Sequence, residues 1–145
     1  MVAGLLAMGG FLSGCRSDEE AVKEAENEVF AIHDEVMPKI DDMMKLKKQL
    51  NQRVASMDSL NATGSAAATL RSDEDKEQAM RLRRNLIDAD SLMMSWMSRY
   101  NGDTLAKLSS EDAMRYLSEQ KDQINDVKVK VNSSIEQARS FLGRD

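Results

Sequence analysis

The sequence predicts an all-α protein, an up-down-up antiparallel three-helix bundle that is coiled-coil-like and has a long, kinked first helix. Two observations support this fold class. The 145 residues include 31% charged and only 4% aromatic side chains, with one proline and seven glycines. That composition favours long solvated helices over sheets, which need more β-branched and aromatic residues. Apolar residues also recur every seven positions, which is the spacing of a coiled-coil seam.

The first predicted helix covers about residues 18–60 and carries two lines of apolar residues. The first line has seven-residue spacing throughout: Val22, Val29, Val36, Met43, Leu50 and Met57. The second line is interrupted by Lys39 and Arg53, where neighbours can substitute; its members are Ala25, Ile32, Ile40, Leu46, Val54 and Leu60. Pro38 removes one backbone hydrogen bond, but the apolar register resumes after it. We therefore expect a kink rather than a break.

The second predicted helix follows a turn within residues 61–72 and runs to about Tyr100. Ser72 and Asp75 have the spacing of a capping box at its start. Its seam comprises Ala79, Leu82, Leu86, Ala89, Met93, Trp96 and Tyr100. A wider stripe, expected for a helix that touches two neighbours, adds Met80, Ile87, Met94 and Met97.

The third predicted helix starts at another capping box, formed by Ser109 and Asp112. Its seam comprises Ala113, Leu117, Ile124, Val127, Val131, Ile135, Ala138 and Leu142. Gln120 and Ser134 occupy seam positions, so we expect this helix to be the least tightly held. Short connections make consecutive helices antiparallel neighbours, which gives the up-down-up order.

The first fifteen residues carry no charge and are too short to cross a bilayer as a helix. Their last four residues, Leu12, Ser13, Gly14 and Cys15, resemble the lipobox of bacterial lipoproteins. The resemblance implies that Cys15 receives a diacylglycerol and that the preceding peptide is removed. The pattern departs from a signal peptide in one respect, because no Lys or Arg precedes Cys15; the true start is then expected upstream of Met1.

The predicted organisation is a signal peptide with lipobox at 1–15, an acidic tether at 16–20 and the three-helix bundle domain at 21–145. Two further stretches, Ala31–Lys39 (AIHDEVMPK) and Met44–Leu50 (MKLKKQL), resemble a group of uncharacterised helical lipoproteins. Some of these are labelled "viral A-type inclusion protein". This resemblance implies a helical, lipid-anchored protein and brings no activity with it.

Composition and motifs argue against several function classes. The net charge is −5, with 25 acidic and 20 basic residues, so no global positive field attracts nucleic acid. A single cysteine excludes an internal disulfide. His33, Asp34 and Glu35 are adjacent on a helix and point about 100° apart, so they cannot converge on one substrate atom. We expect no enzyme activity and no cofactor.

When two helices fold back about a turn, residues at the same level have numbers with a constant sum. This sum is expected to be about 133 for the first two helices and about 210 for the last two. One resulting layer is rich in methionine: Met37, Met43, Met44, Met93, Met94, Trp96, Met97 and Met114. It either fills space beside the Pro38 kink or binds a soft metal ion, with His33, Met37 and Met97 as the ligands. A second layer places six cations level with one another: Lys45, Lys47, Lys48, Arg81, Arg83 and Arg84. It is either a solvated face or a belt that binds lipid phosphates or another anion.

These features predict a membrane-anchored lipoprotein of the Gram-negative cell envelope, at the periplasmic face or the cell surface. Its expected role is that of a structural or protein-interaction helical module with an unknown protein partner and no nucleic acid. A seam of this length also permits self-association. The alternative is a periplasmic binder of a small ligand or client, either a soft-metal protein that uses the methionine layer or a helical chaperone.

Overall fold

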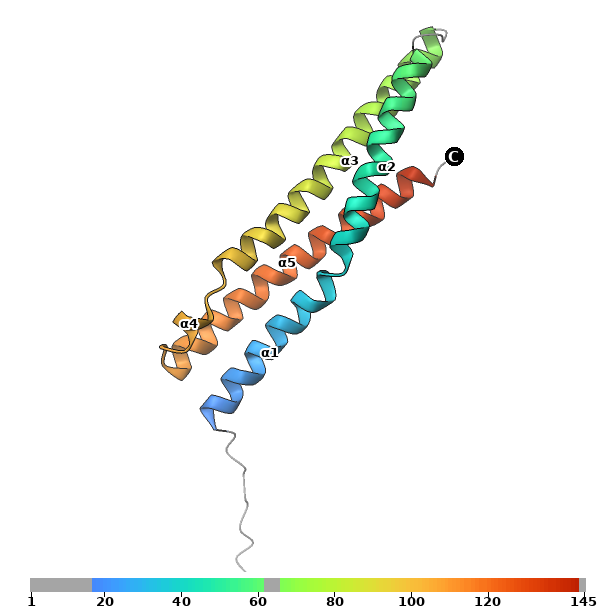
Figure 1. The fold of residues 1–145 in the computed structure, drawn as a ribbon. Coiled ribbons are helices and arrows are strands. Elements are labelled where there is room, and N and C mark those ends of the chain that lie inside the picture. Colours follow the sequence, from blue (N-terminus) through green and yellow to red (C-terminus); the bar gives the residue numbers. More distant parts are fainter. Residues whose placement is uncertain (1–16, 62–65, 144–145) are drawn as a thin grey trace, which may run out of the picture.

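The computed structural model describes residues 17–61 and 66–143, with side chains described outside 60–68. Every regular element in this part of the chain is a helix. Three rods pack antiparallel, as the sequence predicts (Figure 1). The first rod consists of α1 (Asp18–Val36) and α2 (Lys39–Asn61), the second is α3 (Ala66–Arg99), and the third is α5 (Ser110–Leu142). A single turn of helix, α4 (Gly102–Leu105), lies in the connection between the last two rods.

The first rod is 42 residues long and bends by 31°, which confirms the predicted kink. The bend follows from the hydrogen bonds around Pro38. The Met37 amide still donates to the His33 carbonyl at 2.9 Å, but Pro38 has no amide hydrogen to continue the ladder. The Ile40 amide then donates to the Met37 carbonyl at 3.2 Å, three residues back instead of four. This tighter turn changes the direction of the rod.

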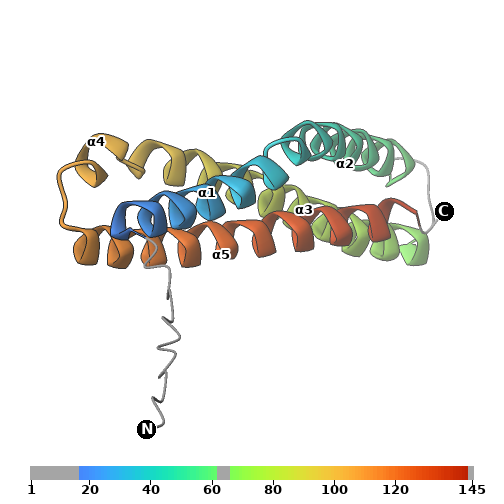
Figure 2. The ribbon, with the colours of Figure 1, turned by 90° about the horizontal axis from the view of Figure 1, so that it is seen from below.

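The bend also changes the neighbours of the first rod. Before it, α1 packs mainly on α5; after it, α2 packs mainly on α3 (Figure 1). Figure 2 shows α1 running along α5, with α2 leaving that line beyond the bend. Because the first and third rods run in the same direction, paired residues of α1 and α5 keep a constant separation in sequence. Glu28 pairs with Lys121 and Glu35 with Lys128, each 93 residues apart.

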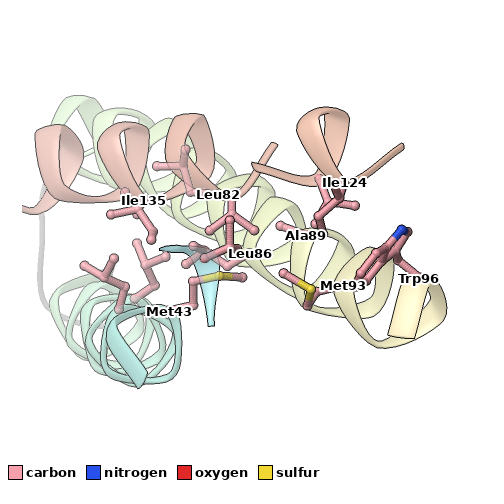
Figure 3. Packing of buried hydrophobic residues seen from close by; sticks show 14 of the residues in the cluster. Met43, Leu82, Leu86, Ala89, Met93, Trp96, Ile124 and Ile135 are labelled. Atoms are coloured by element: carbon pink, nitrogen blue, oxygen red, sulfur yellow. The ribbon is translucent and has the colours of Figure 1, made fainter. Parts of the chain in front are cut away.

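The core is the predicted seam. Every predicted seam residue from Val29 to Met57 on the main line, and from Ala79 to Trp96, is buried. Figure 3 shows Leu82, Leu86 and Met93 of α3 turned toward the same interior as Met43 of α2 and Ile135 of α5. Val22, Ala25, Ile32, Ile40, Val54, Tyr100 and Leu142 are partly buried against this core, while the side chain of Leu60 lies outside the described set.

The prediction that the third helix is least tightly held is wrong. α5 supplies ten buried residues, more than any other helix, because it contacts α1, α2 and α3. The two polar seam residues differ. Ser134 is buried and its hydroxyl donates to the Asn85 carbonyl of α3 at 3.3 Å. The side-chain oxygen of Gln120 is buried without a hydrogen-bond partner among the described residues. Phe141, which the seam pattern omits, is buried one position before Leu142.

One predicted helix start is confirmed and the other is wrong. The Ser109 side chain accepts a hydrogen bond from the Asp112 amide at 3.2 Å, as a capping box requires. Ser72, in contrast, lies inside α3, which begins at Ala66. The three alanines at 66–68 are strong helix formers and extend the helix past the proposed cap. Since Ser140 lines the same groove as Gln78, residues 66–77 of α3 run beyond the end of α5 as a hairpin with α2 (Figure 1).

Met43 and Met44 provide a matched test of this packing, because they are adjacent in sequence but 0% and 58% exposed. Met43→Ala removes a fully buried side chain and is expected to lower the free energy of unfolding by about 2–5 kcal/mol. Met44→Ala is expected to change it by less than about 0.5 kcal/mol. Urea unfolding followed by circular dichroism measures both. Equal losses in the two variants would contradict this description of the core.

Candidate functional site

The strongest site prediction from the sequence concerns lipidation. Leu12, Ser13, Gly14 and Cys15 lie outside the described residues. The first described residue, Ser17, caps α1: its side chain accepts a hydrogen bond from the Glu20 amide at 3.3 Å. The acidic residues Asp18, Glu19 and Glu20 form the first turn of α1, where negative charge is favourable for a helix. Part of the proposed tether at 16–20 is therefore helical.

Aromatic rings gather where α3 ends, against the second half of α1 and the early turns of α5. Phe30 meets Tyr100 edge to face with 5.0 Å between ring centroids, and His33 lies 5.7 Å from Trp96. Tyr100 lies between Trp96 and Tyr116, at 5.5 and 6.0 Å. Sequence analysis missed this cluster, although the four-residue spacing of Trp96 and Tyr100 indicated one aromatic face on the second rod. The cluster joins α1 and α5 to the end of α3.

The two tyrosine hydroxyls of this cluster have polar partners. The Tyr100 hydroxyl donates to Glu26 Oε1 at 2.7 Å, and the Tyr116 hydroxyl accepts from the Asn101 amide at 3.0 Å. Burial raises the pKa of Tyr100 well above its ordinary value of about 10, and the hydrogen bond to Glu26 raises it further. The indole nitrogen of Trp96, buried in the same cluster, has no hydrogen-bond partner among the described residues.

The three residues of the soft-metal alternative differ in their surroundings. His33 Nδ1 lies 2.9 Å from Asp34 Oδ1, and its ring packs against Trp96. Met37 is partly buried against the core, whereas Met97 is 39% exposed. Among the described residues, no group of three or more His, Cys, Asp or Glu side chains has the arrangement of a metal site. Glu35 turns away from His33 and pairs with Lys128.

The predicted methionine layer is only partly assembled. Met43 and Met93 are buried in the core, while Met44, Met94, Met97 and Met114 are exposed. Met114 was placed in this layer by the register of the last two helices, and that register is wrong. Asn85 lies opposite Gln137 and Ser134, so paired numbers sum to 222 and 219 instead of about 210. The connection that contains α4 runs along the first turns of α5 instead of crossing directly, which moves Met114 away from Trp96.

The six cations of the predicted basic belt do not share one surface. Lys47 pairs with Asp90 of α3 at 3.0 Å, on the side of the α2–α3 pair away from α5. Lys45 lies 3.7 Å from Asp42 in its own helix, and Asp42 also pairs with Arg139 of α5. Arg81 and Arg84 line a groove between α3 and α5. Lys48 and Arg83 make no ion pair within the described part of the chain.

A groove of about 570 Å³ lies between α2 and α5. Four of its polar side chains are already bonded in pairs. Lys39 donates to Asn132 at 2.8 Å, and Arg139 donates to Asp42 at 2.8 Å. These contacts join α2 to α5 and leave all four side chains bonded within the chain.

A surface with fewer internal contacts lies on the other side of α2, along its boundary with α3. The Lys47–Asp90 ion pair marks this boundary. Met44 is three residues before Lys47, while Ile87 and Met94 are three before and four after Asp90. Residues three or four apart share a helix face, so these side chains lie one turn from the ion pair. Met97, seven residues after Asp90, continues the same side. We call Met44, Ile87, Met94 and Met97 the methionine flank; all four are exposed.

No family model, curated protein or solved structure matches the chain.

The hydrogen bond of Tyr100 yields a pH-dependent prediction. A raised pKa in the folded state means that the unfolded chain loses this proton first, so the stability from Tyr100 is present below pH about 10 and is lost as the pH rises further. Tyr100→Phe removes the bond to Glu26 and is expected to cost about 1 kcal/mol at neutral pH. Thermal melts between pH 8 and 11 should fall less steeply for Tyr100→Phe than for the unmodified chain. Parallel curves would contradict a raised tyrosine pKa.

Proposed function

We propose that this protein is a membrane-anchored lipoprotein of the bacterial cell envelope, in which a helical bundle serves as a structural and protein-interaction module. The lipid is attached at Cys15, within the lipobox Leu12–Cys15. The proposal rests on the sequence pattern and on the geometry of the bundle. Two or more acyl chains, each contributing about 0.8 kcal/mol per buried methylene, give durable anchoring. No described helix is long and apolar enough to span a membrane.

The observation that carries the proposal is the position of the first rod. α1 begins at Asp18, three residues after Cys15, so a lipid on that cysteine holds this end of the bundle close to the membrane. The rod then continues for 42 residues, or about 63 Å at 1.5 Å per residue. Its far end is the α2–α3 hairpin, which extends past α5 (Figure 1). An anchored bundle of this shape presents its sides and its tip away from the lipid surface.

The charged residues of the first rod pair with other rods, which supports an interaction role rather than a catalytic one. Carboxylates on the first rod pair with cations of the other two rods. Glu28 and Glu35 bind Lys121 and Lys128 at 2.6 Å, and Asp58 pairs with Lys76 of α3. Lys128 lowers the pKa of Glu35 by its hydrogen bond, which keeps this carboxylate ionised. These groups pair across the boundaries between rods and are not collected around a substrate-sized space.

Metabolic labelling with palmitate tests the anchor. The full-length chain expressed in a Gram-negative host is expected to incorporate label and to fractionate with membranes. Cys15→Ser should abolish both, because the acyl acceptor is lost. Ser17→Ala, two residues further on, is the matched control and should retain label. Equal labelling of the unmodified chain and Cys15→Ser would contradict the proposal.

A further inference from the structure

The methionine flank is an apolar surface that no described helix covers. Met44 and Met94 are each 58% exposed, and Met97 and Ile87 are 39% and 37% exposed. α5 lies on the opposite side, where Asn85 meets Gln137 and Asp42 meets Arg139. The flank is therefore a shallow apolar strip between two antiparallel helices, at the position that a fourth helix occupies in a four-helix bundle. Unbranched methionine side chains can adapt to a partner that packs there.

The charges around this strip are uneven. Lys48 follows Met44 by four residues and Arg83 precedes Ile87 by four, so each lies one turn from the strip. Neither has an ion-pair partner within the part of the chain that the structure describes. Lys47, nearer the strip, is already neutralised by Asp90. The strip therefore has unpaired positive charge at its end nearer the α2–α3 hairpin, in a chain whose net charge is −5.

A second copy of the chain is a poor match for this surface. If two copies are anchored in one membrane through Cys15, their bundles stand parallel. The flank of one then meets the flank of the other at the same height, which places Lys48 and Arg83 opposite the same cations. Like charges facing each other oppose association. An antiparallel pair avoids that repulsion but puts the two lipid anchors at opposite ends.

We infer that the methionine flank is the docking site for an amphipathic helix of a partner protein, one whose apolar stripe is bordered by Asp or Glu. The inference rests on the proposed interaction role and names the chemistry of the partner. The apolar stripe packs on Met44, Ile87, Met94 and Met97, and the acidic border meets Lys48 and Arg83. Helix-in-groove recognition of this kind supplies affinity through apolar anchors and orientation through charge.

Two synthetic helical peptides test the inference, each about 21 residues long so that it spans the strip. Both carry the same leucine stripe; one has Glu on its borders and the other Lys. Binding to the full chain carrying Cys15→Ser is measured by fluorescence anisotropy, so the result does not depend on lipidation. The Glu-bordered peptide is expected to bind, and the Lys-bordered peptide to bind at least about tenfold more weakly.

Substitutions locate the site. Met44→Gln with Met94→Gln should weaken binding of the Glu-bordered peptide by about tenfold or more. Val129→Gln is the matched control, because Val129 is 66% exposed on α5, and should leave binding unchanged. Lys48→Glu with Arg83→Glu should reverse the preference between the two peptides. Circular dichroism verifies that each variant stays folded. Folded variants are expected because the substituted side chains are not buried in the core.

Three outcomes would overturn the inference. The first is that neither peptide binds better than a scrambled sequence, and the second is equal loss of binding in the Val129 control. The third is a dimer of the full chain by sedimentation that Met44→Gln with Met94→Gln dissociates, since this assigns the flank to a second copy. Each result leaves the palmitate experiment unaffected, so failure of the docking site is distinguishable from failure of the anchor.

Discussion

The missing amide hydrogen of Pro38 determines which helices lie side by side in this bundle. With an unbroken ladder, a straight first rod would lie in one groove along its whole length. The tight turn at Met37–Ile40 instead directs α1 onto α5 and α2 onto α3. The apolar seam continues through the bend, with Val36 and Met43 both fully buried, so the change of neighbour leaves the core continuous.

The polar contacts between the first and third rods also change at the bend. Two pairs between α1 and α5 are separated by 93 residues, and Lys39 also meets Asn132 at that separation. Past the bend, Asp42 meets Arg139 at a separation of 97, a shift of one helical turn. Exposed ion pairs contribute little stability individually. Their seven-residue spacing favours one parallel alignment of the first and third rods over alignments displaced by a turn.

The sequence predicted the helices, their order, the kink and the seam, because these depend on local spacing. It did not predict how the last two rods align, since residue counting cannot reveal how far the connection that contains α4 runs along α5. The predicted position of Met114 was wrong for that reason. The predicted start of the second helix was wrong because the helix preference of the preceding alanines outweighed the capping pattern at Ser72. The aromatic cluster needs three rods together, so pairwise helix reasoning could not reveal it.

The methionine flank follows from the same geometry. A helix with a wide apolar stripe needs neighbours on two sides, and α3 has the stripe of such a helix in Ile87, Met94 and Met97. α5 covers one side of α3. α2 packs along another side of α3. Ile87, Met94 and Met97 remain exposed at the edge of that contact, and Met44 of α2 extends the exposed strip. Contiguous exposed apolar surface of this kind is typical of interaction sites, and it is the basis of the docking site that we propose.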